Sequence, residues 1–429
     1  MNILMMSNTY TPIVGGLERS VQTFTEEYRR RGHRVIIVAP TFEGMPSDEN
    51  DVIRVPAVQH FNHTDFSVQL PIPGFLQEAL KNFRPDVIHA HHPFLIGDTA
   101  LRVAYQFNAP LVYTYHTLFE YNTHYVPGDS PVLKRFTRQL SVGYANLADQ
   151  VFAPSQGIRA MLEAQGVRSP IAVVPTGLDL SRFSKESSIK SRDVLGIPRD
   201  AYLVGYVGRL APEKNLDFLS RAVLSFLKKR SDAYFLVVGK GPSERTIRDI
   251  FGSQSMQDRV FFTGALEGDT LIEAYHAMNV FAFASKSETQ GMSLVEAMAA
   301  GVPVVALDAL GIHGLIENRV NGILINREDE IEFARALNYL ANLPAGERKV
   351  IGNAARATAS CYSKEACAEL ALSFYAPLTR IVLGRRDRGS VWGDSVWAKT
   401  LRQLRADWEL VKNVTKAAST AMKGGTHVP

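Results

Sequence analysis

The feature that most constrains the fold is an alternation of short apolar runs with helical patterns, which occurs in two successive series. The apolar runs are nearly continuous Val, Ile and Leu, as in strands buried on both faces of a parallel sheet. The expected strands are 2–6, 34–39, 86–90, 110–115, 150–153 and 171–174, then 202–207, 233–238, 259–262, 279–283, 303–306 and 322–325. Helical patterns fill the gaps at 17–31, 75–83, 131–147, 216–229, 293–300 and 328–340. The sequence therefore predicts an α/β protein with two tandem Rossmann-like, doubly wound parallel sheets.

A polar, irregular stretch at 176–198 separates the two series, and we place the linker there. We expect a first domain over 1–178, a second over 179–360 and a tail over 381–429. Open α/β sheets bind ligands at the carboxyl ends of their strands. We therefore expect the chemistry in a cleft between the carboxyl ends of the two sheets.

Composition excludes several classes of protein. Of 429 residues, 46% are hydrophobic and 21% charged, which is ordinary globular usage and not that of a disordered, collagen-like or coiled-coil chain. No run of 18 apolar residues occurs, and the first six residues are typical of a strand, not of a signal peptide. Two cysteines are too few for a disulfide scaffold or a usual zinc site, so a reducing cytoplasm is expected. No Asp-x-Asp pair is present to hold a metal on a diphosphate, so no metal or other cofactor is expected.

The net charge of +4 is unevenly distributed. Residues 377–429 carry +6, whereas the rest of the chain carries −2. In the tail, Trp397, Leu401, Leu404, Trp408 and Val411 recur at helical spacing, and Lys399, Arg402, Arg405, Lys412 and Lys416 lie largely on other faces. This pattern predicts a basic amphipathic helix with an anionic membrane as partner. The alternative is that the helix packs on the first domain or on a partner chain; nucleic acid is a poorer explanation, because no base-reading module precedes the tail.

The second half contains a candidate diphosphate site. Arg209 and Lys214 follow the strand 202–207, after Gly208, where a strand ends and a helix begins. An arginine fork and a lysine point charge suit a diphosphate. The alternative is that Lys214 only pairs with a nearby carboxylate. Gly239 and Gly241 follow the next strand, and Glu244 replaces the third glycine of the dinucleotide fingerprint, so we interpret this segment as a tight nucleotide-facing loop and not as an NAD site.

The sharpest pattern is the segment 288–296, Glu-Thr-Gln-Gly-Met-Ser-Leu-Val-Glu. A helix starting near Met292 would present the N–H groups of Gly291, Met292, Ser293 and Leu294 as a phosphate seat. Glu288 and Glu296 could then accept hydrogen bonds from sugar and ribose hydroxyls. The alternative is that both acids only stabilise the helix start.

The first half contributes a glycine pair and a histidine. Gly15 and Gly16 follow the first strand, where paired glycines let the backbone approach a ligand; a plain turn is the alternative. His116 ends the strand 110–115 and could contact a substrate hydroxyl, or could be structural. His89, His91 and His92 point in different directions, so we interpret them as a cleft-lining turn and not as metal ligands.

Together these residues resemble the retaining nucleotide-sugar glycosyltransferases of glycosyltransferase family 4, which have the two-Rossmann GT-B fold. The resemblance covers residues 1–376 and rests on Gly15 with Gly16, His116, Arg209 with Lys214, the segment 175–179, and Glu288 with Glu296. It departs from the family at Thr176, where asparagine is frequent. It implies that Glu288 contacts the donor hexose and Glu296 the ribose, that Arg209 and Lys214 hold the diphosphate, and that His116 lies beside the sugar. It also implies that the loop around Ala265 faces the base and that a helix over 361–380 crosses back to complete the first domain.

The acceptor has to be argued from the first half and the tail. The segment 115–126 resembles that of diacylglycerol glucosyltransferases within the family, which makes Glu18, Tyr121, His124 and Tyr125 candidate acceptor residues. Aromatic and basic residues over 119–138, together with the helix at 391–420, would contact the membrane. The resemblance thus implies hexosyl transfer, with UDP-glucose as donor, to a lipid on the inner face of the cell membrane. The alternatives are a soluble acceptor in polysaccharide or glycoside synthesis, a nucleotide-sugar epimerase, and a binding-only NAD protein.

Overall fold

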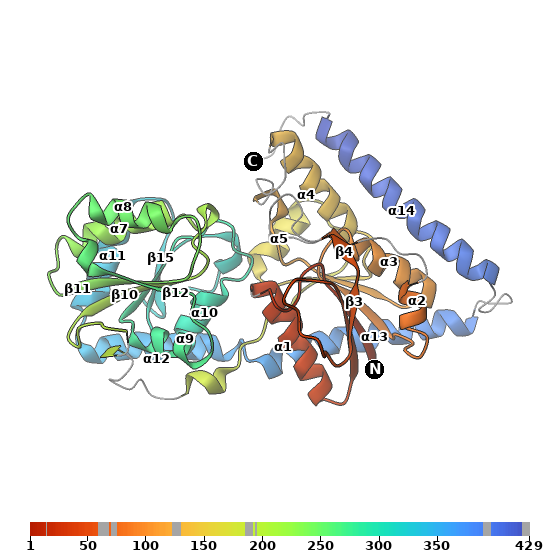
Figure 1. The fold of residues 1–429 in the computed structure, drawn as a ribbon, viewed down its shortest axis with the longest axis horizontal. Coiled ribbons are helices and arrows are strands. Elements are labelled where there is room, and N and C mark those ends of the chain that lie inside the picture. Colours follow the sequence, from red (N-terminus) through yellow and green to blue (C-terminus); the bar gives the residue numbers. More distant parts are fainter. Residues whose placement is uncertain are drawn as a thin grey trace. The chain divides into compact units, whose positions relative to one another are not determined.

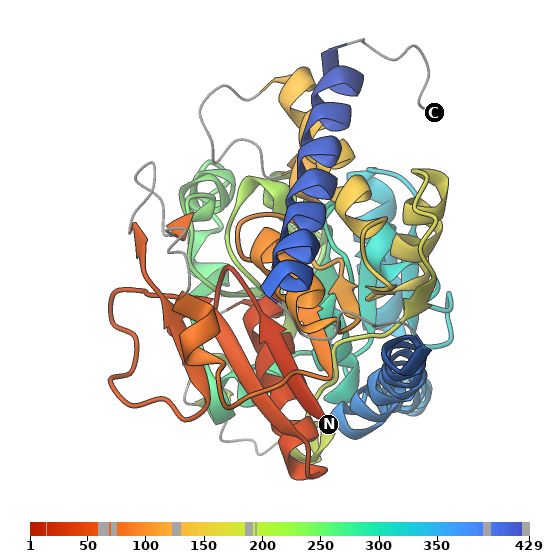
Figure 2. The same cartoon turned by 90° about the vertical axis from the view of Figure 1, so that its right-hand side faces the viewer.

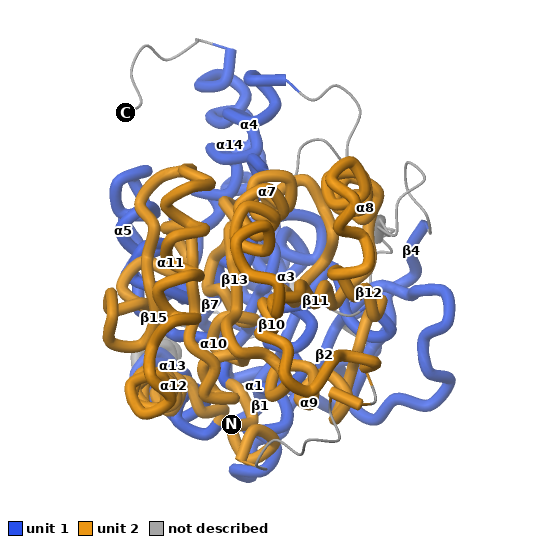
Figure 3. Tube along the Cα trace, turned by 90° about the vertical axis from the view of Figure 1, so that its left-hand side faces the viewer, with its two compact units in different colours: residues 1–177, 365–429 blue, residues 178–364 orange. Residues whose placement is uncertain are grey.

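The computed structural model describes residues 1–13, 15–58, 68–69, 75–121, 130–184, 192–193, 195–388 and 396–422, some of them by their backbone alone. They form two compact units (Figure 3). Unit 1 comprises residues 1–177 and 365–429, and unit 2 comprises residues 178–364.

Unit 1 is built on a seven-stranded parallel sheet in the order β3-β2-β1-β6-β7-β8-β9. Its strands are β1 (Asn2–Met6), β2 (Arg34–Pro40), β3 (Val52–Val55), β6 (Val87–Ala90), β7 (Leu111–Thr114), β8 (Gln150–Ala153) and β9 (Ile171–Val173). A separate antiparallel pair is formed by β4 (Ala57–Val58) and β5 (Val68–Gln69). The helices are α1 (Gly16–Arg30), α2 (Phe75–Ala79), α3 (Ile96–Phe107), α4 (Pro131–Ala145), α5 (Gln156–Ala164), α13 (Lys364–Arg388) and α14 (Val396–Met422).

Both faces of this sheet are covered, which is why its strands are apolar on both sides. Side chains of α1 and α13, such as Phe24 and Tyr375, pack with Ile3 and Val112 on one face. Side chains of α3, α4 and α5 pack on the other face. The expected pattern of a doubly wound sheet is therefore confirmed.

Unit 2 repeats the plan with a six-stranded parallel sheet in the order β12-β11-β10-β13-β14-β15. Its strands are β10 (Tyr202–Val207), β11 (Ala233–Val238), β12 (Val260–Gly264), β13 (Val280–Phe283), β14 (Val304–Leu307) and β15 (Gly322–Ile325). Its helices are α7 (Leu216–Leu227), α8 (Glu244–Gly252), α9 (Gly268–Ala277), α10 (Met292–Ala299), α11 (Glu330–Asn342) and α12 (Ala345–Ser360). Residues of α7, α8 and α11 pack on one face, and residues of α9, α10 and α12 pack on the other.

The structure differs from the sequence prediction at the edges of elements. We missed β3, a four-residue edge strand interrupted by the polar Arg54, and the two-residue strands β4 and β5. Helix α13 extends to Arg388, because Pro377 lies inside the helix and does not end it. Within the described residues, no helix is both long and apolar enough to cross a bilayer.

The predicted tail helix is present as α14, which lies along α4 and α3 of unit 1 (Figure 1, Figure 2). The face that packs is not the predicted apolar one. Among the described side chains of α14, the buried ones are Ala406, Leu410, Asn413, Ala417 and Ala421. The predicted face stays exposed at Leu401, Leu404, Trp408 and Val411, and the side chain of Trp397 lies outside the described part of the structure.

Candidate functional site

Tight backbone packing shapes the carboxyl edge of the unit 2 sheet. Gly208 follows β10 and Gly239 follows β11; both have positive φ angles, of 156° and 143°. A Cβ atom on Gly239 would lie 1.9 Å from the carbonyl oxygen of Gly208, and one on Gly241 would lie 2.3 Å from that of Leu210. Glycine is therefore required here by the close approach of two loops, a physical reason that the sequence alone did not reveal.

The two predicted diphosphate cations are each paired with a carboxylate. Arg209 Nη2 lies 2.5 Å from Glu213 Oε1, and its side chain is 56% exposed. Lys214 follows in a single 3-10 turn (Pro212–Lys214), and its ammonium forms an ion pair with Glu288. The expected alternative for Lys214 was a pairing with a nearby carboxylate. The carboxylate that pairs with Lys214 is not a local one. It belongs to Glu288, 74 positions away, which the sequence predicts as part of the same donor site.

The loop before α10 has the geometry expected of a helix start. Gly291 is the N-cap residue with φ of 69°, a left-handed conformation that favours glycine. One part of the prediction was wrong: the N–H group of Leu294 donates to the Gly291 carbonyl at 2.9 Å, because the first turn closes there. The phosphate seat that we predict therefore has to be built from Gly291, Met292 and Ser293.

A residue that the sequence analysis missed supports this loop. Gly311 lies in the 3-10 turn Leu310–Ile312, where an added Cβ atom would come within 2.4 Å of the Glu288 carbonyl oxygen. The Glu288 backbone thus rests directly on that of Gly311. No sequence signal pointed to this contact, because an isolated glycine after a strand has many structural uses.

Glu296 is 6% exposed, and its Oε2 atom accepts a hydrogen bond of 2.6 Å from the Tyr275 hydroxyl. A buried carboxylate needs such a partner, because burial without a hydrogen bond is costly. Ala265 follows Gly264 at the end of β12, and the Gly264 carbonyl accepts a hydrogen bond from Gly239 N at 2.8 Å. The loop predicted to face the base and the tight loop predicted to face the nucleotide are thus adjacent.

In unit 1, His116 lies after β7, where it is half-buried beside the buried His89, His91 and His92. Its Nε2 atom is 2.8 Å from His91 Nδ1, and the two rings stack with centroids 5.1 Å apart. Burial lowers the pKa of His116 to about 3 and holds that of His91 well below its ordinary value. Both rings are therefore neutral near pH 7, so one donates to the other, and each fixes the other's tautomer.

The prediction treated His89, His91 and His92 as one turn, and the structure gives each of them a separate partner. His89 bonds to the Tyr375 hydroxyl and to Thr114, both at 2.6 Å, and His92 Nδ1 accepts from Asn8 N at 3.1 Å. Among the described residues, His91 Nε2 is buried without a hydrogen-bond partner. In that same part of the chain, no three His, Cys, Asp or Glu side chains are grouped as metal ligands.

The glycine pair of the first loop serves the start of α1. Gly15 is the N-cap residue, and its Cα lies against the Glu18 carboxylate, since a Cβ atom there would be 2.5 Å from Glu18 Oε2. Burial raises the pKa of Glu18, although a hydrogen bond from Thr9 opposes the shift. Tyr121 is 48% exposed at the end of the turn Phe119–Tyr121. His124 and Tyr125 lie outside the described residues.

Comparisons with known proteins identify the family. The family model described as Glycosyltransferase Family 4 matches residues 14–182, and that described as Glycosyl transferases group 1 matches residues 187–358. The chain is 29% identical over 339 residues to the alpha-monoglucosyldiacylglycerol synthase of Streptococcus pneumoniae, covering 77% of this chain and 76% of that protein. It is 31% identical over 330 residues to a GDP-mannose-dependent alpha-mannosyltransferase of Mycobacterium tuberculosis, covering 75% and 83%. The sucrose-phosphate synthase from Thermosynechococcus elongatus has a similar fold, with a TM-score of 0.74 at 22% identity over 89% of this chain and 99% of that one.

Proposed function

This chain belongs to glycosyltransferase family 4, and from that premise we propose that it transfers glucose from UDP-glucose to a lipid acceptor such as diacylglycerol, with retention at the anomeric carbon. We also propose that it works as a peripheral protein on the inner face of the cell membrane, through residues 119–138 and 391–420. In this proposal unit 2 binds the donor and unit 1 binds the acceptor.

The observation that carries the donor assignment is the ion pair between Lys214 and Glu288. It joins a cation suited to a diphosphate with a carboxylate suited to a sugar hydroxyl, and both lie beside the start of α10. In the proposed complex Lys214 turns from Glu288 to the diphosphate, as does Arg209 from Glu213. Glu288 is then left to accept from the hexose, while Glu296, held by Tyr275, accepts from the ribose.

The proposed chemistry needs only charge stabilisation and positioning. The bond between the anomeric carbon and the diphosphate oxygen breaks, and the acceptor hydroxyl oxygen forms the new bond on the same face. Its proton passes to the departing phosphate oxygen. Arg209, Lys214 and the start of α10 stabilise the charge that develops on the diphosphate, so the proposal requires no metal ion. Neutral His116 hydrogen-bonds to the sugar and does not act as an acid or base, because its pKa is lowered to about 3.

The lipid acceptor is supported by two alpha-monoglucosyldiacylglycerol synthases among the relatives, the second from Acholeplasma laidlawii at 27% identity. It is also supported by the exposed Tyr121 and by the basic residues Lys134 and Arg138, which lie on the neighbouring α4. A soluble acceptor is the second candidate. It is favoured by the relatives named D-inositol 3-phosphate glycosyltransferase, one of which, from Actinosynnema mirum, is 31% identical to this chain over 284 residues.

The test is turnover of the purified full chain with UDP-glucose, UDP-galactose, GDP-mannose and UDP-N-acetylglucosamine, each with and without diacylglycerol vesicles. We expect a glycolipid from UDP-glucose only when vesicles are present, and an α configuration by NMR. Donor turnover that vesicles do not change would contradict the lipid acceptor and favour the soluble one. An isomerised donor sugar formed without acceptor would instead favour an epimerase.

A further inference from the structure

Helix α14 is held on unit 1 by specific contacts along its length. Arg102 Nε of α3 lies 2.7 Å from Asp407 Oδ1, and Asn413 Nδ2 donates to the Leu140 carbonyl of α4 at 3.1 Å. Arg135 donates to the Ala421 carbonyl at 3.3 Å, near the end of the helix. These bonds and the small buried residues fix the rotation of α14 about its own axis. They therefore also determine which face of the helix is exposed to solvent.

The face turned to solvent is apolar with a basic edge. Leu401, Leu404, Trp408 and Val411 are between 55% and 62% exposed. At about 100° per residue they lie on one side of the helix, opposite the buried face. Arg405 and Lys412 follow Leu404 and Val411 by one position, and Lys416 continues this row, so exposed cations border the apolar side chains along one flank. Lys412 Nζ lies 5.4 Å from the Trp408 ring centroid.

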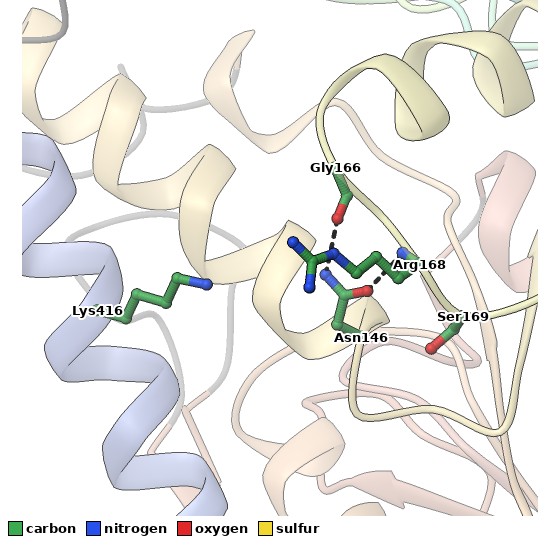
Figure 4. Close-up of a pocket in the computed structure, with 5 residues that line it drawn as sticks. All are labelled: Asn146, Gly166, Arg168, Ser169 and Lys416. Atoms are coloured by element: carbon green, nitrogen blue, oxygen red, sulfur yellow. Dashed lines mark hydrogen bonds between the residues drawn. The ribbon is translucent and has the colours of Figure 1, made fainter.

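Beside the basic flank is a hollow of about 370 Å³ lined by Asn146, Gly166, Arg168, Ser169 and Lys416 (Figure 4). The amide of Asn146 forms its wall: Oδ1 accepts from Arg168 N at 2.6 Å, and Nδ2 donates to the Gly166 carbonyl at 3.1 Å. A second hollow of about 200 Å³ shares four of these residues and extends toward Asn413.

Two cations thus meet at this hollow, one from the loop before β9 and one from α14. Within the described residues, neither the Arg168 guanidinium nor the Lys416 ammonium has a carboxylate at ion-pair distance, unlike Arg102, Arg159 or Lys412. Two uncompensated cations at one hollow are suited to a phosphate group.

We propose that α14 is a docking face for an anionic phospholipid surface, with Arg168 and Lys416 holding a lipid phosphate in the hollow while Trp408 and its apolar neighbours enter the acyl boundary. An interfacial helix has this arrangement, with apolar side chains toward the acyl chains and cations at the level of the phosphates. The inference deepens the membrane part of the proposed function. It does not concern the acceptor, which binds elsewhere in unit 1.

Vesicle co-sedimentation of the full chain tests the proposal without donor or acceptor, so its outcome is independent of turnover. One set of vesicles contains phosphatidylcholine alone, and the other contains equal parts of phosphatidylcholine and phosphatidylglycerol. We expect strong binding to the second set only. The double variant Arg168→Gln/Lys416→Gln should bind it about 30-fold more weakly, because each cation near an anionic surface contributes about 1 kcal/mol.

The apolar face is tested by Leu404→Ser/Trp408→Ser, which should weaken binding more than about tenfold through lost apolar burial. The control is Lys229→Gln/Arg245→Gln, which removes the same charge from two exposed positions of unit 2, one in the turn after α7 and one in α8, and should bind as the wild type does. Thermal unfolding of each variant checks that the fold is retained, since all these side chains are exposed.

Three results would overturn the proposal. The first is wild-type protein that does not sediment with phosphatidylglycerol vesicles. The second is a hollow variant that binds them no more weakly than the unit 2 control. The third is a wild-type dimer that Leu404→Ser/Trp408→Ser dissociates with vesicle binding unchanged, which would assign the face to a second copy of this chain.

Discussion

The ion pair between Lys214 and Glu288 leads to a prediction with opposite signs for its two members. Lys214→Ala removes a cation that would bind the diphosphate, whereas Glu288→Gln removes the carboxylate that holds this cation in the free protein. Free UDP has a diphosphate but no hexose, so its affinity reports on Lys214 without the sugar contact of Glu288. We expect Lys214→Ala to weaken UDP binding and Glu288→Gln to leave it unchanged or strengthen it.

The magnitudes follow from the exposure of the pair. A charge-assisted hydrogen bond contributes about 1.5–3 kcal/mol, so Lys214→Ala should weaken UDP binding about 10- to 150-fold. The two side chains are 21% and 18% exposed, and a solvent-accessible pair is worth at most about 1 kcal/mol, so Glu288→Gln should strengthen UDP binding by no more than about fivefold. Turnover should fall in both Lys214→Ala and Glu288→Ala, by about 30- to 1000-fold, because transition-state contacts of about 2–4 kcal/mol are lost.

Isothermal titration with UDP measures the affinity, and initial rates with UDP-glucose measure turnover. Lys228→Ala is the matched control, because Lys228 lies at the opposite end of α7 and bonds to Gln254 at 2.7 Å. The reasoning is refuted if Glu288→Gln weakens UDP binding as much as Lys214→Ala does. It is also refuted if both alanine variants turn over at the wild-type rate.

Three further predictions concern other parts of the molecule. Gly311→Ala places a methyl group 2.4 Å from the Glu288 carbonyl oxygen. This should displace the loop that holds Glu288 and lower kcat by up to about 100-fold, and an unchanged kcat would show that Gly311 does not position this loop. Gly143→Ala places a methyl group 1.7 Å from Asn413 Oδ1, so this substitution should lower the free energy of unfolding. In an Asn413→Ala background the same substitution should raise the free energy of unfolding by up to about 1 kcal/mol, because alanine is preferred over glycine in a helix. Additive effects of the two substitutions in urea unfolding would argue against this contact. The pKa of His92 is lowered from 6.5 to about 3, so between these values the unfolded chain binds more protons than the folded one. The stabilising contribution of neutral His92 is therefore complete above pH 6.5 and is lost as the pH falls toward 3, by up to about 1.4 kcal/mol per pH unit. His92→Asn should reduce this dependence of the free energy of unfolding on pH, measured by urea unfolding, and an equal slope in both proteins would refute the prediction.

The strands and most helices could be predicted because their signal is local. A strand buried on both faces needs consecutive apolar residues whatever its neighbours are, so β1 and β10 are visible in the sequence alone. Edge strands such as β3 lack that signal, since one side of the strand has no neighbour and tolerates polar residues. Helix α13 continues past Pro377, and Leu378 beyond it still packs against the unit 1 core that holds Cys367 and Ala371, so packing overrides a local preference.

The candidate site divides in the same way. Motifs 74 positions apart suggested Lys214 and Glu288 separately, and only the folded sheet brings their side chains into contact. Two further contacts depend on distances between different strands and loops, which no spacing along the chain encodes. They are the hydrogen bond between His91 and His116 and the packing of the Glu288 backbone against Gly311.

The sequence by itself determined the two-sheet architecture, because the apolar runs of strands buried on both faces are local signals. Its motifs, among them Glu288 with Glu296, carried the resemblance to the family. The tertiary structure alone decided which face of α14 is free. Periodicity marked one apolar stripe on this helix and predicted that it is the binding face, but small residues allow closer packing than large ones do. Unit 1 therefore took the stripe containing Ala406, Ala417 and Ala421 and left the one containing Trp408 exposed to solvent.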